Sequence, residues 1–288
     1  MTTQSVLQFF ERFPNDEACL EHLWTVRYGD QGECPKCAKP SKFHRVKKRP
    51  VYECAWCAHQ ISPMAGTPFE KSRTPLQKWF YAMYLFTTTR HGVSAKELQR
   101  QLSVTYKTAW RIGHEIRKYM GDVDGNAPLG GVGHDVEVDE TLIGGSVKGK
   151  GQGYKGNKTC VVGMLERDGE LVTQVVTGRD KIAMKGVILS NVLPGSTIQT
   201  DEFGGYKDID QSGYNHVKVN HKLGEYARKD GAGVNGIEAF WAQLKRGING
   251  THVHVSRKHL PKYLGEFEFR YNLRKRPDLM LPALLQAF

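Results

Sequence analysis

The stretch "HDVEVDETLIGG", residues 134–145, alternates charged and apolar side chains in the way that a β-strand does. In a strand of this register Asp135, Glu137 and Asp139 share one face. The preceding stretch "GDVDGNAPLGGVG", residues 121–133, is polar and rich in glycine, which is typical of a linker. We therefore predict that a domain begins with this strand.

The residues that follow predict a defined order of elements. "KTCVVGMLERDGELVTQVVTG", residues 158–178, indicates two strands with a turn at Asp168 and Gly169, and residues 180–191 form a helix. A strand then leads into "STIQTDEFGGY", residues 196–206, followed by a short helix, a strand near 214–219 and helices over 234–250 and about 256–275. This order is that of an RNase H-like α/β fold, in which the first and fourth strands lie side by side.

The stretch "VNGIEAFWAQLKRGING", residues 234–250, has the spacing of an amphipathic helix. Glu238 and Lys245 are seven residues apart, so they lie on one side of this helix, two turns from each other. Both stand at the edge of an apolar stripe formed by Ile237, Phe240, Trp241, Leu244 and Ile248. Packing can hold such edge positions firmly while their side chains reach into a cleft.

Three acids occupy matching places in this predicted fold. Asp139 is at the end of the first strand, Asp201 is at the end of the fourth, and Glu238 is on the late helix. Each has an ordinary explanation by itself, as a turn cap, a helix N-cap or a surface charge, but together they converge on one pocket in this fold. A shift of strand register leaves four neighbouring acids as alternatives, namely Asp135, Glu137, Glu140 and Glu202.

The predicted chemistry of these acids is phosphodiester cleavage. A carboxylate trio can hold two divalent cations about 4 Å apart, one activating a water or sugar hydroxyl and the other stabilising the leaving oxygen. Oxygen ligands favour Mg²⁺ or Mn²⁺ over zinc. Lys245 is placed to contact the phosphate beside the scissile bond, and Arg246 is a second predicted DNA contact next to it.

Two cysteine pairs in the N-terminal part predict a structural zinc site. Cys34 and Cys37 form one C-x2-C knuckle, and Cys54 and Cys57 form another. Four thiolates at this spacing complete the closed tetrahedral shell of a zinc ribbon, which leaves no open position for a substrate. The ion is therefore expected to fold the module and to take no part in chemistry.

Three further segments are candidates for DNA contact. Residues 94–102 and a helix from about Thr105 resemble a helix-turn-helix whose second helix carries Lys107, Arg111, Arg117 and Lys118; a plain helical hairpin is the alternative. Between the cysteine knuckles, "KFHRVKKRP" contains Lys47, Lys48 and Arg49, which suit either a phosphate backbone or a solvated turn. The stretch 144–158, rich in Gly and Lys, fits either a DNA-binding segment or a plain loop.

The composition agrees with a nucleic-acid partner. The chain has 41 Lys and Arg against 30 Asp and Glu, a formal net charge of +11, and such an excess favours a polyanion. The longest apolar run, "WFYAMYLF", is far shorter than the roughly 20 residues that span a bilayer. We expect a cytoplasmic protein that associates with the nucleoid when bound to DNA and has no membrane partner.

Six blocks of the sequence together resemble insertion-sequence transposases of the DDE class, in the ISXO-like group with an N-terminal zinc ribbon. The blocks are "CPKC…CAWC", "GTPFEKSRTPLQKWFYAMY", "VEVDETLIGG", "TDEFGGY", "VNGIEAFWAQLKRGINGTHVHVSRKHL" and "YLGEFEFRYNLR". The resemblance implies metal-dependent cleavage at transposon ends and transfer of the 3′ hydroxyl into target DNA. It also implies Asp139, Asp201 and the segment 235–238 as the catalytic set, with Lys245 as the accompanying base.

The third catalytic residue has two candidates, because members of this group are described with Asn or with Glu. Asn235 and Glu238 are one turn apart, and a carboxylate binds a hard cation more tightly than an amide, which favours Glu238. Two alternatives to a transposase remain: a DNA-binding regulator that has lost catalysis, and a structure-selective nuclease of the same fold. A transposase acts on two DNA ends in one reaction, which also implies a homodimer or a larger oligomer on DNA.

The predicted organisation is an α+β multidomain chain. It comprises an N-terminal helix and zinc ribbon (1–62), a helix-turn-helix region (63–120), a linker (121–133) and an RNase H-like catalytic domain (134–288).

Overall fold

The structure is a computed structural model that describes residues 4–29, 32–124, 127–144, 156, 158–219 and 233–288. The chain forms two compact units. Unit 1 comprises Met1–Thr89, Ala95–Tyr119 and Arg276–Phe288, and unit 2 comprises Arg90–Ser94 and Met120–Lys275. Residues 276–288, which the sequence analysis assigns to the C-terminal domain, therefore belong to unit 1.

Unit 1 begins with two capped helices and a small sheet. Helix α1 (Val6–Arg12) starts with a capping box between Ser5 and Gln8, and the side chain of Asn15 caps α2 (Asp16–Tyr28). Three short antiparallel strands follow, β1 (Phe43–Arg45), β2 (Tyr52–Cys54) and β3 (Gln60–Ile61), in the order β1-β2-β3. Trp24 of α2 stacks on Tyr52 of β2 with ring centroids 4.1 Å apart, which attaches this sheet to the helix.

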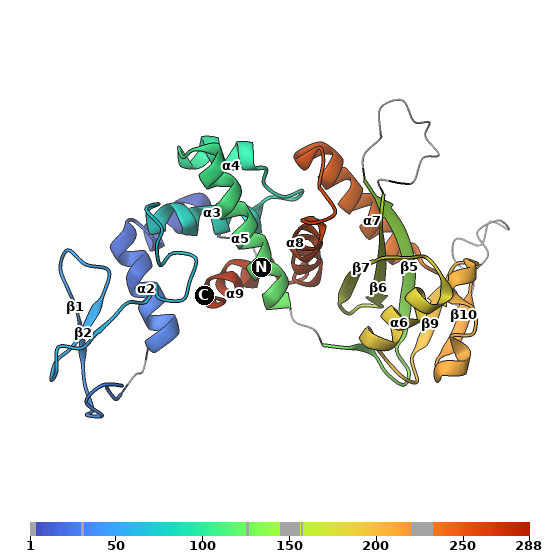
Figure 1. Ribbon diagram of the computed structural model, residues 1–288, viewed down its shortest axis with the longest axis horizontal. Coiled ribbons are helices and arrows are strands. Elements are labelled where there is room, and N and C mark those ends of the chain that lie inside the picture. The colour runs from blue at the N-terminus through green and yellow to red at the C-terminus, as the bar shows by residue number, and fades with distance from the viewer. Residues whose placement is uncertain (1–3, 30–31, 125–126, 145–155, 157, 220–232) are drawn as a thin grey trace. The chain divides into compact units, whose positions relative to one another are not determined.

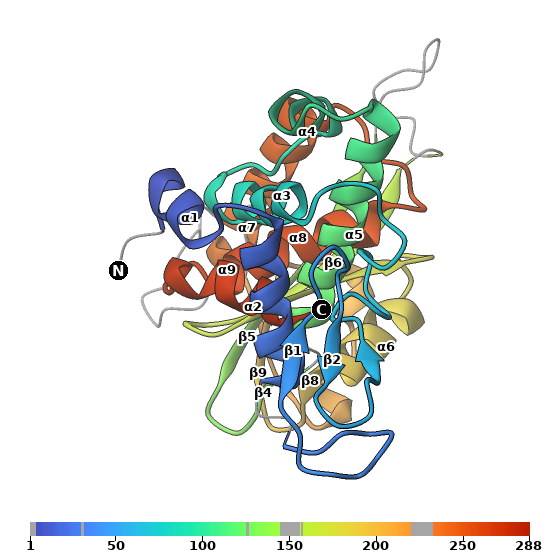
Figure 2. The same ribbon diagram turned by 90° about the vertical axis from the view of Figure 1, so that its left-hand side faces the viewer.

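The remaining helices of unit 1 pack around an apolar helix. Helix α3 (Leu76–Thr88) is buried along most of its length, and α2 and α9 both contact it (Figure 2). Helix α4 (Ala95–Leu102) begins directly after Ser94, as predicted. Helix α5 (Tyr106–Asp124) follows Thr105, whose hydroxyl accepts a hydrogen bond from the backbone N–H of Thr108 at 3.3 Å.

The C-terminal segment joins unit 1 because it carries an apolar face. A 3₁₀ turn, η5 (Pro277–Leu279), leads into helix α9 (Met280–Gln286). Phe288 then lies against Phe69 and Tyr119, with ring centroids 5.0 and 4.1 Å apart. The helix itself buries Met280, Leu281, Leu284 and Leu285.

Unit 2 is built on a five-stranded mixed sheet in the order β10-β9-β5-β6-β7. Strand β5 pairs antiparallel with β6 and parallel with β9, so the first and fourth main strands of this unit are neighbours, as predicted. The hairpin between β6 and β7 turns at Asp168 and Gly169, also as predicted. The strands are β5 (Asp135–Ile143), β6 (Thr159–Glu166), β7 (Leu171–Val176), β9 (Thr197–Thr200) and β10 (Asn215–Lys218).

Helices cover both faces of this sheet (Figure 1). On one face, α6 (Lys181–Asn191) packs in a core with Val136 and Val138 of β5. On the other face, α7 (Asn235–Gly247), the π-helical turn η4 (Ile248–His252) and α8 (Leu260–Asn272) pack against Val161, Leu165 and Leu171. The smaller elements are β4 (Leu129–Gly130), β8 (Val192–Leu193), η1 (Gly204–Tyr206) and η2 (Asp210–Ser212).

Two local predictions differ from the structure, and a third concerns residues that the structure mostly does not describe. Helix α5 continues to Asp124, so the first part of the predicted linker 121–133 is helical. Strand β5 continues past Asp139 to Ile143 because β6 provides pairing partners as far as Thr159. Most of the stretch 144–158 lies outside the described residues. None of the described helices combines the length and the apolar character needed to cross a membrane.

Candidate active site and metal centre

Parallel pairing brings two of the predicted catalytic acids level with each other. In the register of β5 and β9, Glu137 is the partner of Gln199, and two further steps along both strands align Asp139 with Asp201. Neighbouring strands are about 4.8 Å apart, so these two positions lie level on adjacent strands, Asp139 within β5 and Asp201 just after the end of β9. Asp201 follows β9 directly, and its Oδ1 accepts the backbone N–H of Phe203 at 2.9 Å.

The electrostatics of Asp139 link it to the other two acids. The pKa of Asp139 is raised to about 7, mainly by burial and in smaller part by the charges of Glu140, Asp201 and Glu238. Asp139 therefore lies within the electrostatic reach of both Asp201 and Glu238. The indole Nε1 of Trp241, on α7, donates a hydrogen bond to Asp139 Oδ2 at 3.1 Å and orients this carboxyl group.

The three acids are coupled electrostatically but do not form a compact cluster of ligand atoms. Among the described residues, the four zinc-ribbon cysteines form the one group of three or more His, Cys, Asp or Glu ligand atoms that all lie within 4.8 Å of one another. The three carboxylates of Asp139, Asp201 and Glu238 therefore do not all lie within 4.8 Å of one another. Divalent cations bound between them would offset their mutual repulsion.

Glu137, on the same face of β5 as Asp139, fixes the start of α7. Its Oε2 accepts the backbone N–H of Ile237 at 3.1 Å, at a helix N-terminus where a negative charge is favoured. Glu137 is buried, with 5% of its surface exposed. A Cβ atom on Gly236 would lie 2.9 Å from Oε2 of Glu137, so this close approach of helix and strand requires glycine.

Arg167 joins Glu137 to the segment that enters α7. The guanidinium group donates to Glu137 Oε1 at 3.2 Å, to Gln199 Oε1 at 2.7 Å and to the carbonyl oxygen of Gly233 at 3.1 Å. It also pairs with Asp135 at 3.4 Å. This network sets the position of α7 on the sheet, and therefore the position of Glu238 relative to Asp139. Arg167 and Gln199 were not identified from the sequence; the only signal was the alternation that puts Asp135 and Glu137 on the face of Asp139.

Glu140 points to the opposite face and has a different role. It forms an ion pair with Arg179, and the hydroxyl group of Tyr206 donates to its Oε2 at 2.7 Å. Arg179 in turn lies over the ring of Phe203, 4.6 Å from the centroid. Through these contacts Glu140 joins β5 to η1. Because its carboxylate is already paired there, Asp139 is the better candidate for a metal ligand.

Helix α7 presents the other predicted site residues at its exposed edge. The predicted apolar stripe is buried, and Asn235, Glu238, Lys245 and Arg246 are exposed. Lys245 lines a cavity of about 110 Å³ together with Leu142 and Ile143, so it lies near the end of β5. Asn235 is the first residue of α7, one turn before Glu238.

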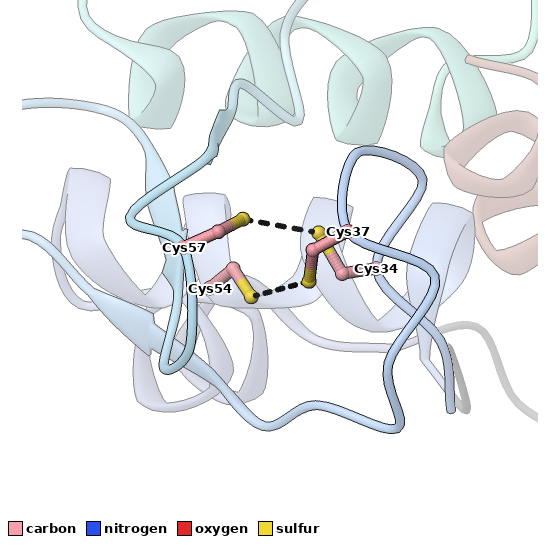
Figure 3. A group of neighbouring side chains, drawn as sticks. All are labelled: Cys34, Cys37, Cys54 and Cys57. Atoms are coloured by element: carbon pink, nitrogen blue, oxygen red, sulfur yellow. Dashed lines mark hydrogen bonds between the residues drawn. The ribbon is translucent and has the colours of Figure 1, made fainter.

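The four cysteines of unit 1 form a cluster with the dimensions of a zinc site (Figure 3). The Sγ atoms of Cys34 and Cys57 are 3.7 Å apart, and those of Cys37 and Cys54 are 3.9 Å apart. Tetrahedral coordination with Zn–S bonds of about 2.3 Å requires sulfur separations of about 3.8 Å. The residues present therefore fit one zinc ion.

The thiol groups of this cluster are strongly coupled. Burial opposes ionisation of Cys54, but hydrogen bonds from Ser41 and from the backbone lower its pKa to about 6. Burial and the neighbouring thiols raise the pKa of Cys57 to about 12. Four adjacent thiolates need a cation to balance their charge, which is what a structural zinc ion supplies.

Comparison with known proteins decides the family. Residues 128–272, half of the chain, match the family model of the ISXO2-like transposase domain, and residues 14–60 match that of the transposase zinc-ribbon domain. The chain belongs to the ISXO2-like transposase family. The matched ranges contain Asp139, Asp201 and Glu238 on the one hand and all four clustered cysteines on the other.

Two curated relatives agree with membership of the ISXO2-like transposase family. The chain is 27% identical over 286 residues to an uncharacterized protein in transposable element ISH50 of Halobacterium salinarum, covering 92% of this chain and 94% of the relative. It is 30% identical over 103 residues to an uncharacterized transposase-like protein of Haemophilus influenzae, covering 36% of this chain and 81% of the relative.

The predicted DNA-contacting residues of this ISXO2-like transposase divide by exposure. Lys107, Arg111 and Lys118 are exposed on α5, and Lys47, Lys48 and Arg49 are exposed between β1 and β2. Arg117 differs from these residues, because it is 2% exposed and its guanidinium group lies over the ring of Phe86 at 4.9 Å. A buried side chain cannot reach a phosphate, so Arg117 is removed from the predicted DNA-contacting set.

Proposed function

We propose that the chain is a DNA transposase with an RNase H-like catalytic domain, which cleaves transposon ends and joins the exposed 3′ hydroxyl to target DNA. Membership of the ISXO2-like transposase family supports the general activity. The neighbouring parallel strands β5 and β9, the strand order and the position of α7 support the fold assignment. The observations that carry the proposed site are the register of the parallel strands β5 and β9 and the hydrogen bond from Trp241, on the helix that carries Glu238, to Asp139.

In this proposal the three acids would hold two Mg²⁺ or Mn²⁺ ions, which would supply activation of the attacking oxygen and stabilisation of the leaving oxygen. A water molecule attacks the phosphorus at the transposon end in the first step, and the P–O3′ bond breaks to release a 3′ hydroxyl. In the second step that hydroxyl attacks a target phosphorus, and a P–O3′ bond of the target breaks. Trp241 orients the Asp139 carboxyl group, and Lys245 holds the neighbouring phosphate.

The N-terminal modules would hold the DNA. We propose that one zinc ion folds the ribbon, and that α4 and α5 act as a helix-turn-helix with Lys107, Arg111 and Lys118 directed to duplex DNA. Lys47, Lys48 and Arg49 would contact the phosphate backbone from the ribbon, and Arg246 from the catalytic domain. Two copies of the chain, or a larger assembly, would bring the two transposon ends together.

The test is cleavage of a duplex that carries the inverted repeat flanking the gene. With Mg²⁺, wild-type protein should nick this duplex at the 3′ end and join it to a plasmid, whereas Asp139→Asn and Asp201→Asn should do neither. Asp168→Asn is the matched control, because Asp168 lies on the β6–β7 turn with a side chain that is 96% exposed. Activity retained by either site variant would contradict the site.

The two alternative functions give different results in the same assay. A regulator that has lost catalysis would bind the repeat with or without metal and leave it intact. A structure-selective nuclease would cut branched DNA and yield no joined product. Either result would replace the transposase proposal.

A further inference from the structure

A second cavity lies at the end of the sheet at which β5 stops. Its volume is about 220 Å³, and three adjacent strands line it through Leu142 of β5, Cys160 of β6 and Val176 of β7. Three cationic residues from separate segments complete the lining, namely Lys158 just before β6, Arg179 just before α6 and Arg257 just before α8. None of these residues belongs to the predicted catalytic set, and Lys158 alone falls in a candidate DNA-contacting segment, as the last residue of the stretch 144–158.

The charge at this cavity is positive. Glu140 is the acid that pairs with one of its cations, through Arg179. Lys158 and Arg257 form no ion pair with any acid in the described part of the chain. Two positive charges are therefore uncompensated at a concave surface, where an anionic ligand would be attracted.

Arg179 is held in place and retains a donor. Its guanidinium group lies over the Phe203 ring at 4.6 Å and pairs with Glu140 through Nη2, so the side chain is ordered before any ligand arrives. The Nε atom of Arg179 is buried and has no hydrogen-bond partner among the described residues. A buried N–H group without a partner is costly, and a ligand oxygen would remove that cost.

We propose that this cavity binds a phosphodiester group of the DNA strand that is cleaved at Asp139; the proposal rests on the proposed function. Guanidinium groups suit phosphate because their planar N–H donors match two of its oxygens. From Asp139 to Leu142 the strand advances on the order of 10 Å, at about 3.3 Å per residue. Leu142, Cys160 and Val176 face α6, on the side of the sheet opposite to Asp139, so the DNA strand would also pass around the end of β5, on the order of 10 Å more. Because duplex DNA has one phosphate per about 3.4 Å of axis on each strand, the bound phosphate lies within about six nucleotides of the cleaved bond.

The experiment measures DNA binding without divalent metal, so that it does not depend on catalysis. The probe is a short duplex from the transposon end in which single phosphates near the cleavage position are replaced, one at a time, by uncharged methylphosphonates. The test variant is Lys158→Gln/Arg257→Gln. The matched control is Lys185→Gln/Lys207→Gln, which removes the same charge from residues near Asp208. Thermal unfolding checks that both variants fold.

With wild-type protein and with the control, one neutral linkage within about six nucleotides of the cleaved bond should weaken binding several-fold. With the test variant the same linkage should have no further effect, and the slope of log affinity against log salt should fall by about one. An identical methylphosphonate profile for the test variant and wild type would overturn the proposal.

A second arm separates this inference from the proposed function. Inorganic phosphate is titrated against each protein, and the melting temperature is followed. One outcome would overturn the DNA assignment. In it, phosphate raises the melting temperature of wild type and of the control but not of the test variant, while all three proteins give the same methylphosphonate profile. The cavity would then bind a free anion and not the DNA backbone. If the protein binds no transposon-end DNA, the proposed function fails, and the absence of phosphate stabilisation would in addition refute the anion site.

Discussion

Trp241 on α7 donates its indole N–H to Asp139 on β5 over a distance of 3.1 Å. This bond joins the helix that carries Glu238 to the strand that carries Asp139. Glu137, two residues earlier on β5, accepts the backbone N–H of Ile237 at the start of the same helix. Helix and strand are thus joined at two points two residues apart on β5, which fixes both the rotation and the translation of α7 over the candidate site.

Trp241→Phe should reduce catalysis more than stability, because it removes the donor while keeping an aromatic ring in the core. Loss of such an orienting bond typically lowers metal affinity or activity about 10- to 100-fold. The measurement is the cleavage rate as a function of Mg²⁺ concentration. Phe240→Leu is the control, since it changes the volume of the same buried stripe without removing a donor. An equal Mg²⁺ dependence in the two variants would show that Trp241 has only a packing role.

Changes at the start of α7 should act through geometry. Gly236→Ala places a Cβ 2.7 Å from Leu165 and 2.9 Å from Glu137, so the helix must move away from β5. Overpacking of this kind costs about 1–3 kcal/mol, and we expect denaturant unfolding to show a loss in this range together with loss of cleavage. Ala239→Gly, at an exposed position of α7, is the control, with a cost of about 1 kcal/mol and retained cleavage. Full cleavage by Gly236→Ala would show that the position of α7 is not critical.

Removal of zinc should unfold the ribbon. Elemental analysis should find one zinc per chain, and a strong chelator should abolish the thermal transition of the N-terminal residues, because binding energy at such sites is folding energy. Cys54→Ser should lose the metal. Cys19→Ala should retain it, since Cys19 is buried in α2 and is not part of the cluster. Normal folding of the metal-free protein would contradict a structural zinc site.

A buried carboxyl group at the edge strand β7 predicts that the stability of the protein depends on pH. At β7, the outward-facing N–H of Thr173 donates to Glu268 of α8, and Asn272 bonds both the N–H and the carbonyl oxygen of Leu171. Burial, with a smaller contribution from nearby Asp124, raises the pKa of Glu268 from 4.5 to about 7. Because the folded-state pKa is above the unfolded-state pKa, the stability contribution is complete below about pH 4.5 and is lost as the pH rises through about 7.

Glu268→Gln should therefore stabilise the protein above pH 7, by on the order of 1–3 kcal/mol, and leave it unchanged near pH 4. The amide oxygen of Gln can still accept the N–H of Thr173. The free energy of unfolding is measured in denaturant from pH 4 to pH 8.5, with Asp168→Asn as an exposed control. If the pH profile of Glu268→Gln is that of wild type, Glu268 does not carry the pH dependence.

Local patterns were sufficient for the elements and insufficient for the contacts between them. Alternation in 134–145 predicted β5 and its acidic face, and helical spacing in 234–250 predicted the buried stripe of α7. The network of Arg167 could not be predicted, because it joins residues from β5, β9 and the entry to α7 that only the folded sheet brings together. The end of β5 was misplaced at Asp139 because antiparallel pairing with β6, and not the local sequence, determines how far the strand extends.

Exposure should separate two arginines of α5 by function. Arg117 is buried against Phe86, so Arg117→Gln should lower the free energy of unfolding by about 1–3 kcal/mol through loss of this contact and of packing. At a temperature where this variant is folded, its DNA affinity should equal that of wild type. Arg111 is exposed, so Arg111→Gln should leave stability within about 0.5 kcal/mol and weaken DNA binding, with a salt slope smaller by about one. Stability and DNA affinity are measured for both variants. Weaker DNA binding by folded Arg117→Gln would contradict the assignment of the exposed face of α5 to DNA contact. Unchanged DNA binding by Arg111→Gln would contradict it as well.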